Sequence, residues 1–271
     1  MTGAGRLRVM SLNLRGPDDA EPNRWPGRLP VVAGLLRDWL PDLVGTQEGL
    51  YPRLEDLAEE AGDLGYRWIG LGREGGSRSE FVAVFYRHDR FRPVAFGHFW
   101  LSRSPGTAGS VLAGAWPAIP RMVTWARFRE RATGREVVHV NTHLDHRSGR
   151  ARRRGAEMIA AFVAPLLKAG DQVILTGDFN AAAVSSRPYK ILTRLLADTW
   201  PVGDASRPAT FHGYRHPTLR LDGERCIDWI LASPGLTPVD AQVLAATKPG
   251  PGGPVYPSDH WPVLADLRVA E

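Results

Sequence analysis

Residues 175–181 read LTGDFNA: the end of an apolar run, a glycine, and then an acid and an amide two positions apart. Side chains at positions i and i+2 of an extended chain point the same way, so Asp178 and Asn180 can face one cleft where a buried strand ends. Ordinary turn chemistry explains GDFN alone equally well, because Asp and Asn cap turns and helices. The choice between the two interpretations therefore depends on the rest of the sequence.

The same pattern recurs at other predicted strand ends. Acids, amides and imidazoles flank five further apolar runs: Asn13, Gln47 with Glu48, Asn141 with His143 and Asp145, Asp228, and Asp259 with His260. A crowded cluster of such groups is costly to fold unless a cation or an anionic ligand uses it. We therefore predict that these side chains share one polar site.

Strand-like and helical runs alternate along the chain, and the strands over residues 66–143 have hairpin spacing. Strands are predicted at residues 7–14, 43–47, 66–72, 81–87, 91–102, 121–129, 136–143, 172–176, 226–233, 239–247 and 261–270, and helices at 28–40, 54–61, 149–168 and 188–197. Parallel crossovers mixed with hairpins indicate mixed sheets covered by helices, an α/β layered architecture. The Gly/Pro-rich residues 249–257 are predicted to form a loop at the rim of the site.

Composition narrows the class of protein. The chain has 271 residues, 43% of them hydrophobic, and without a repeat or a composition shift it is predicted to form a single domain over residues 1–271. Cys226 is the only cysteine, which excludes an intrachain disulfide and a cysteine zinc cluster. Since no signal segment or membrane span is recognisable, we expect a cytoplasmic protein with no membrane partner and no obligate protein partner.

The net charge of +5 comes almost entirely from arginine. The densest cluster is RSGRARRR at residues 147–154, which opens a predicted helix. A solvated helix face is the favoured interpretation of this cluster, and a phosphate-binding surface is the alternative.

The chemistry that these groups allow is narrow. Carboxylates and amides with few sulfurs suit a hard cation, either Mg²⁺ or Mn²⁺. Zinc is less favoured, because the sequence has no HExxH-like spacing. The sequence has no GxSxG nucleophile setting and no Walker A loop. What remains is hydrolysis of a phosphate ester by direct attack of water, with a carboxylate to deprotonate the water and an imidazole to stabilise the transition state.

The ordered motifs Asn13, TQE ending at Glu48, NTHLDH around His143, GDFNA, IDWI and SDHWP resemble the endonuclease/exonuclease/phosphatase superfamily. FWLSRSP at residues 99–105, together with PRMVTW, further resembles bacterial members related to the nocturnin and deadenylase branch. The resemblance implies a four-layer α/β sandwich, in which two mixed β-sheets pack face to face with helices on the outside.

The resemblance also implies roles around a metal ion. Glu48 resembles the principal metal-binding carboxylate, with Asn13 and Asp259 near the same ion. Asp178 resembles the residue that orients or deprotonates the attacking water, and Asn180 resembles the amide that holds a phosphate oxygen.

Two histidines resemble groups that contact the phosphate. His260 resembles the imidazole at the scissile phosphate, and Asp228 would orient it and favour its charged form. His143 resembles a second phosphate-contacting histidine. The histidines outside these motifs, His146 and His212 among them, are expected on the surface or in the packed interior.

Three further residues are candidates with alternatives. Arg121 is predicted to contact substrate phosphate or to form a structural salt bridge. Asn141 is predicted to bind substrate, because it shares a strand face with the site. Glu80 is predicted to pair with His143, or to be an ordinary exposed glutamate at a strand end.

The sequence therefore predicts a Mg²⁺-dependent phosphoesterase that hydrolyses a phosphodiester or phosphomonoester without a covalent intermediate. The substrate would be a nucleotide, a nucleic acid or a small phosphorylated metabolite. One alternative is a nuclease or 3′-exonuclease acting on RNA or DNA. An alternative of another class is a non-catalytic protein that binds a phosphate ligand or nucleic acid.

Overall fold

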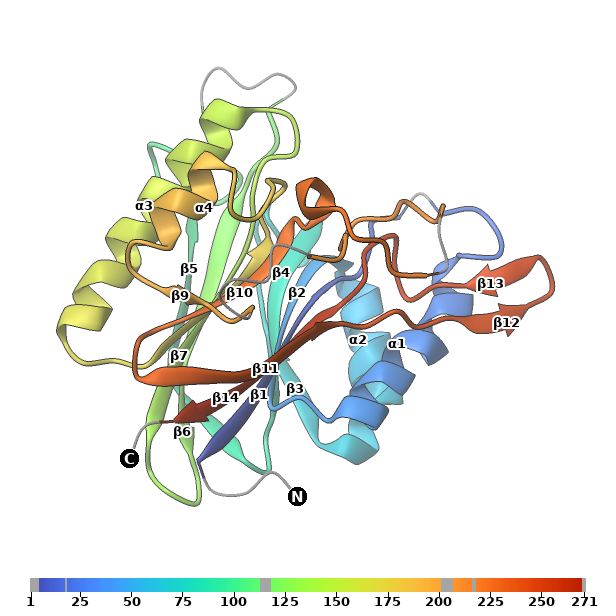
Figure 1. Ribbon diagram of the computed structural model, residues 1–271, viewed down its shortest axis with the longest axis horizontal. Helices are drawn as coiled ribbons and strands as arrows, with labels where there is room; N and C mark the ends of the chain where they lie inside the picture. Colours follow the sequence, from blue (N-terminus) through green and yellow to red (C-terminus); the bar gives the residue numbers. More distant parts are fainter. Residues whose placement is uncertain (1–4, 18, 113–117, 201–206, 216–217, 270–271) are drawn as a thin grey trace.

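The computed structural model describes residues 5–17, 19–112, 118–200, 207–215 and 218–269. In this part of the chain, two six-stranded mixed sheets pack face to face. Figure 1 shows α1 (Trp25–Trp39) and α2 (Tyr51–Glu60) outside one sheet, and α3 (Gly149–Lys168) and α4 (Arg187–Leu192) outside the other. The predicted four-layer α/β sandwich is confirmed.

The first sheet brings both ends of the chain together. Its order is β11 (Leu236–Val243), β14 (Val263–Val269), β1 (Arg6–Asn13), β2 (Leu43–Leu50), β4 (Glu80–Arg87) and β3 (Tyr66–Ile69). β1 and β2 are parallel and are connected through α1, whereas the other neighbours in this sheet are antiparallel. The carboxyl ends of β1 and β2 therefore lie at the same edge.

The second sheet has the same mixture of directions. Its order is β5 (Phe91–Trp100), β6 (Met122–Glu130), β7 (Glu136–His143), β8 (Val173–Asp178), β10 (Asp228–Ala232) and β9 (Ala197–Asp198). β7 and β8 are parallel and are connected through α3. His143 and Asp178, the last residues of these strands, therefore meet at one edge.

Three apolar layers hold the sandwich together, and strand alternation decides which residue enters which layer. Val9 and Ile174 face the core between the sheets. Their neighbours point the other way: Met10 packs with α1 and α2, and Leu175 packs with α3. All four side chains are 0% exposed, so both sheets are covered on both faces.

Several boundaries differ from the sequence-based expectation. The helix expected at 188–197 ends at Leu192, and the strand expected at 239–247 spans Leu236–Val243. The strand expected at 261–270 spans Val263–Val269, and residue 270 lies outside the described residues. Among the helices that the structure describes, none has the length and apolar character needed to cross a membrane.

The prediction of a rim loop at residues 249–257 was wrong. Most of this segment forms a hairpin of β12 (Lys248–Gly250) and β13 (Gly253–Val255), because the glycines at its tip permit a tight turn. The hairpin lies against α1, beyond the sheets (Figure 1), and Lys248 Nζ donates to the Pro30 carbonyl at 2.9 Å.

Asn141 joins the two sheets instead of facing a substrate, so its predicted binding role needs correction. Its side chain is 0% exposed, and its Nδ2 donates to the carbonyls of Thr46 and Ala83, each at 2.8 Å. Its Oδ1 accepts from Gln47 Nε2 at 2.9 Å and from Thr176 Oγ1 at 3.0 Å. Every polar atom of the amide is therefore satisfied inside the protein.

We expect Asn141→Ala to lower the free energy of unfolding by about 3 kcal/mol, because it leaves several buried hydrogen-bond partners of Asn141 unsatisfied and out of reach of water. Gly45→Ala should disrupt the same bridge, since a Cβ at residue 45 would lie 2.0 Å from Thr176 Oγ1. Thermal and urea unfolding measure both effects, with Thr237→Ala at an exposed position of β11 as the control. An Asn141→Ala protein of unchanged stability that loses only substrate affinity would restore the binding role.

Candidate active site

Polar side chains from both sheets meet where their strands end. In the second sheet, His143 is paired in register with Asp178, and Asp178 with Asp228, so the three residues form a row across β7, β8 and β10. From the first sheet, Asn13 lies at the end of β1 and Glu48 near the end of β2. The strand topology therefore brings five of the predicted site residues to one edge of the sandwich.

Asn13 joins the carboxylates of the two sheets. Its Nδ2 lies 2.9 Å from Glu48 Oε1 and 3.0 Å from Asp178 Oδ2, and Glu48 Oε2 accepts from Gly16 N at 2.8 Å. Glu48 has a φ of 61°, at a register shift in the β2–β4 pairing. A left-handed glutamate is strained, and a bulge of this kind re-aims a side chain toward a site.

His260 is held as a cation by its carboxylate neighbours. Its Nδ1 lies 2.9 Å from Asp228 Oδ2, and its Nε2 lies 3.8 Å from Asp178 Oδ2. Burial alone would lower the pKa of His260, but the charges of Asp228 and Asp178 outweigh burial and raise that pKa well above its usual value. The imidazolium is therefore the stable form at neutral pH.

His143 has the opposite charge state. Burial, followed by the positive charges of Arg121 and Arg73, lowers the pKa of His143 well below its usual value. Its Nε2 lies 3.0 Å from Asn180 Nδ2 and 3.5 Å from Asp178 Oδ2. Since the amide nitrogen can only donate, the lone pair of the neutral His143 Nε2 accepts from Asn180, and a cation bound at Nε2 would replace this hydrogen bond.

Asn180 and Asp178 form a compact turn at the end of β8. Asn180 N donates to Asp178 Oδ1 at 2.9 Å, and Asn180 has a φ of 48°, which Asn tolerates better than most residues. Burial, followed by the neighbouring Asp228 carboxylate, raises the pKa of Asp178 to about 7. Asp178 can therefore hold a proton or release one near neutral pH.

The donor atoms fit a divalent cation. Two sets of side chains have their ligand atoms within 4.8 Å of one another: Glu48 with His143 and Asp178, and Asp178 with Asp228 and His260. The first set has two carboxylates and a neutral imidazole, whereas His260 in the second set is protonated and bonded to Asp228. Glu48, His143 and Asp178 are therefore the better candidates to hold a cation.

Asp259 lies at the edge of the cluster in an ion pair with Arg15. Its Oδ2 is 3.3 Å from Arg15 Nη1, and burial is the main cause that raises its pKa, with Glu48 contributing. Asp259 is outside the two sets of cation ligands. Arg15 was not predicted from the sequence, because its only signal there is its position two residues after Asn13.

Arg121 lines a small cavity together with His143 and Glu80. Its side chain is nearly buried, its Nη2 lies 3.1 Å from His146 Nδ1, and its Nε has no hydrogen-bond partner among the described residues. Glu80 is paired with Arg73, at 2.6 Å between Oε2 and Nη1, and this pair replaces the predicted one with His143. Arg121 Nε is therefore a buried donor that no described residue uses.

Buried acids, a neutral and a protonated imidazole, and a set of cation ligands at the edge of an α/β sandwich define a metal-dependent phosphoric ester hydrolase. The chain belongs to the Endonuclease/Exonuclease/phosphatase family, whose sequence model matches residues 10–260. The resemblance recognised from the ordered motifs is thereby confirmed. No curated protein sequence matches the chain.

Solved structures agree with this assignment. A family protein from Bacteroides thetaiotaomicron is 31% identical, with 98% of each chain covered and a TM-score of 0.86. A mannosyl-6-phosphatase from the same species is 31% identical, covering 96% of this chain and 99% of its own, also with a TM-score of 0.86. The human nocturnin catalytic domain is 18% identical, and the match covers 98% of this chain and 95% of that domain. Its TM-score of 0.73 shows a shared fold.

We expect Glu48→Gln to weaken binding of Mn²⁺ or Mg²⁺ at least ~10-fold, since loss of one carboxylate charge removes a principal ligand. Isothermal titration calorimetry with each metal measures the effect directly, without any substrate. Glu59→Gln on the exposed face of α2 is the matched control and should bind metal like the wild type. Equal affinity in the Glu48→Gln protein would exclude Glu48 as a ligand.

Proposed function

We propose that this chain is a Mg²⁺-dependent phosphoesterase, that Mn²⁺ can replace Mg²⁺, and that residues 1–271 act as one catalytic domain. The observation that carries the proposal is the position of Asp178. Its Oδ2 lies within 3.0 Å of Asn13 Nδ2, 3.5 Å of His143 Nε2 and 3.8 Å of His260 Nε2. A buried carboxylate with a raised pKa, beside a charged imidazole, supports general acid–base chemistry.

The side chains divide the reaction between them. Asp178 Oδ2 accepts the proton of the attacking water as the new P–O bond forms and the ester P–O bond breaks. His260 Nε2 donates to a phosphoryl oxygen, and Asp228 holds Nδ1 so that the ring keeps its charge and direction. Arg121, whose side chain lines the cavity beside His143, contributes its guanidinium charge next to the phosphate, as its predicted role requires.

The residues present also suit a cation. Glu48 and His143 would hold it beside Asp178, whose Oδ2 stays available as the base, while Asn13 fixes Glu48 and Asp178 in place. When bound, Mg²⁺ supplies Lewis-acid neutralisation of the phosphoryl oxygens. Asn180 holds His143 beside this position, because its Nδ2 donates to His143 Nε2 at 3.0 Å and to the Leu144 carbonyl at 3.1 Å; a cation bound at Nε2 would replace the first of these two bonds.

A small phosphorylated molecule is the favoured substrate. The mannosyl-6-phosphatase from Bacteroides thetaiotaomicron, which matches along nearly the whole of both chains, supports a phosphomonoester of a sugar. Within a family that includes nucleases and phosphatases, we therefore propose phosphomonoesters as the first substrate class. The non-catalytic alternative is disfavoured, because each site residue retains a chemically competent side chain.

We expect the purified protein to release nitrophenol from p-nitrophenyl phosphate in the presence of Mg²⁺ or Mn²⁺ and to lose this activity in EDTA. Asp178→Asn should lower kcat at least ~100-fold, the scale of losing a positioned base. Bis-p-nitrophenyl phosphate, assayed in parallel, distinguishes a diesterase from a monoesterase.

Asp38→Asn on the exposed face of α1 is the charge-matched control for Asp178→Asn, and it should leave kcat unchanged. Far-UV circular dichroism and thermal melts show whether each variant is folded. A folded Asp178→Asn protein that keeps wild-type turnover would remove Asp178 from the role of base.

Action on nucleic acid is the second candidate function, and one observation favours it. A cavity of about 400 Å³ lies along the amino-terminal part of α3 and is lined by Arg103, Arg150, Arg153 and Arg154. Glu157 pairs with Arg153 and Arg154, whereas among the described residues no carboxylate pairs with Arg103 or Arg150. Two arginines are therefore available to phosphates of a longer substrate.

If RNA or DNA is the substrate, kcat/KM for a short oligonucleotide should fall steeply as salt rises, because each neutralised phosphate adds roughly one unit to the log–log slope. The double variant Arg103→Ala/Arg150→Ala should make that slope shallower. A small sugar phosphate, measured in the same buffers, should show a weak dependence in both proteins. An oligonucleotide rate that is insensitive to salt would exclude this function for the cavity.

A further inference from the structure

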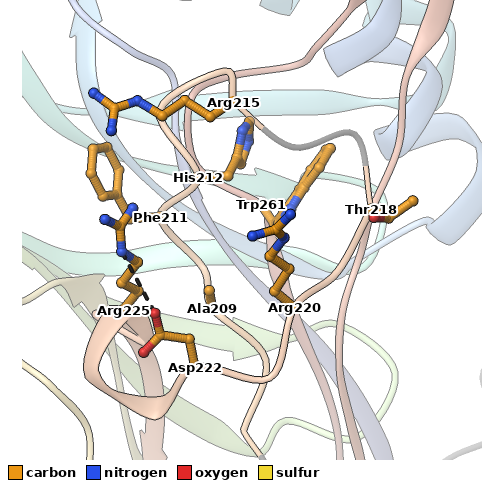
Figure 2. A pocket seen from close by; sticks show the side chains of 9 residues that line it. All are labelled: Ala209, Phe211, His212, Arg215, Thr218, Arg220, Asp222, Arg225 and Trp261. Carbon is orange, nitrogen blue, oxygen red and sulfur yellow. Dashed lines mark ion pairs between the residues drawn. The ribbon is translucent and has the colours of Figure 1, made fainter.

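An arginine-lined cavity of about 200 Å³ adjoins the candidate active site (Figure 2). Its lining includes the side chains of Phe211, Arg215, Arg220, Asp222, Arg225 and Trp261. In the view of Figure 2, the Arg215 and Arg225 side chains lie toward Phe211, and the Arg220 side chain lies toward Trp261. The cavity therefore combines aromatic walls with guanidinium groups.

The charge of this cavity is unbalanced. Three arginines face one acid, and that acid is used by Arg225, whose Nε lies 3.6 Å from Asp222 Oδ2. Among the residues that the structure describes, no carboxylate lies within ion-pair distance of Arg215 or Arg220. Both are exposed. Two guanidinium groups with a planar set of donors are therefore open to an anion.

The cavity is fixed relative to His260. Phe211 forms a β-bridge with His260, and their ring centroids lie 5.0 Å apart. The backbone N–H groups of His212 and Gly213 both donate to the Asp259 carbonyl at 3.0 Å. One aromatic side chain thus separates the arginine-lined cavity from the imidazole of the active site.

The size of the cavity limits what it can hold. Whole small-molecule sites usually enclose ~300–1,000 Å³. A volume of about 200 Å³ suits one part of a ligand instead. Since His260 lies directly beyond Phe211, the remainder of the ligand would extend into the active site.

We propose that this cavity binds a second anionic group of the substrate, so that the preferred substrate class is a small bisphosphate in which one phosphate is hydrolysed and the other is held by Arg215 and Arg220. The inference rests on the proposed phosphoesterase function and adds a specificity determinant to it. Phe211 lies between the two phosphates, against the carbon skeleton that joins them.

The experiment compares matched substrates. With Mg²⁺ present, kcat/KM is measured for fructose 1,6-bisphosphate against fructose 1-phosphate and fructose 6-phosphate. Adenosine 3′,5′-bisphosphate is measured in the same way against its two monophosphates. In the wild type we expect at least one bisphosphate to exceed its monophosphates ~10-fold or more, the scale of one charge-assisted hydrogen bond.

The double variant Arg215→Ala/Arg220→Ala should erase this advantage through KM, while the monophosphates and p-nitrophenyl phosphate keep their wild-type rates. Arg92→Ala/Arg187→Ala is the control, because it removes the same charge from exposed positions on β5 and α4, away from the cavity. An equal loss in the control protein would attribute the effect to net charge and overturn the proposal.

Two negative results separate the inference from the function on which it rests. If p-nitrophenyl phosphate is hydrolysed but neither bisphosphate is preferred, the cavity proposal fails and the phosphoesterase function stands. If no ester is hydrolysed, the function fails, and isothermal titration calorimetry with both bisphosphates tests the cavity alone. Binding that is weakened ~10-fold by the double variant supports the cavity, and equal binding or none overturns it.

Discussion

The active site depends on one amide that links the two sheets. Asn13 on β1 donates to Glu48 at 2.9 Å and, across the sandwich, to Asp178 on β8 at 3.0 Å. The amide fixes the positions of the two carboxylates but does not neutralise their charge. Close carboxylates in a buried place repel, so the cluster has to share protons or attract a cation. The close spacing of these buried carboxylates lowers the stability of the fold, and the same spacing suits a metal ion that can in turn bind a phosphate.

Strand order explains why the sequence indicated so much of this cluster. His143, Asp178 and Asp228 lie at strand ends, and β7, β8 and β10 are neighbours, so three separate motifs form one row. The i, i+2 rule placed Asn180 beside Asp178, which is correct in location. The physical cause of this location is not the alternation of an extended strand. β8 ends at Asp178, and the left-handed φ of 48° turns Asn180 toward His143.

The errors arise where depth or a distant partner decides the role. Asn141 shares a strand face with His143 but lies two residues earlier, about 7 Å deeper along the strand. There it meets Gln47 and Thr176 between the sheets, where no substrate can reach it. The sequence shows which way such a side chain points, but not where the opposite sheet ends. Likewise, nothing in the sequence around Glu80 identified Arg73 as its partner.

The two site histidines show how far local sequence can mislead about charge. Each lies near an acid in the sequence, in HLDH and in SDHW, yet Asp145 is not among the main causes at His143, and Asp259 contributes less at His260 than Asp228 and Asp178 do. Asp145 instead accepts from the backbone N–H groups of Arg147 and Ser148 ahead of α3. His143 is neutral because burial and the charges of Arg121 and Arg73 oppose protonation.

His260 is charged because Asp228 and Asp178 stand on the neighbouring strands of the second sheet. One imidazole can therefore offer a lone pair to a cation while the other donates a proton to a phosphate oxygen. This division of labour follows from the tertiary structure, since burial and the charges of residues far away in the sequence decide it. A chain with the same motifs in a different strand order would keep its histidines and lose the difference between them.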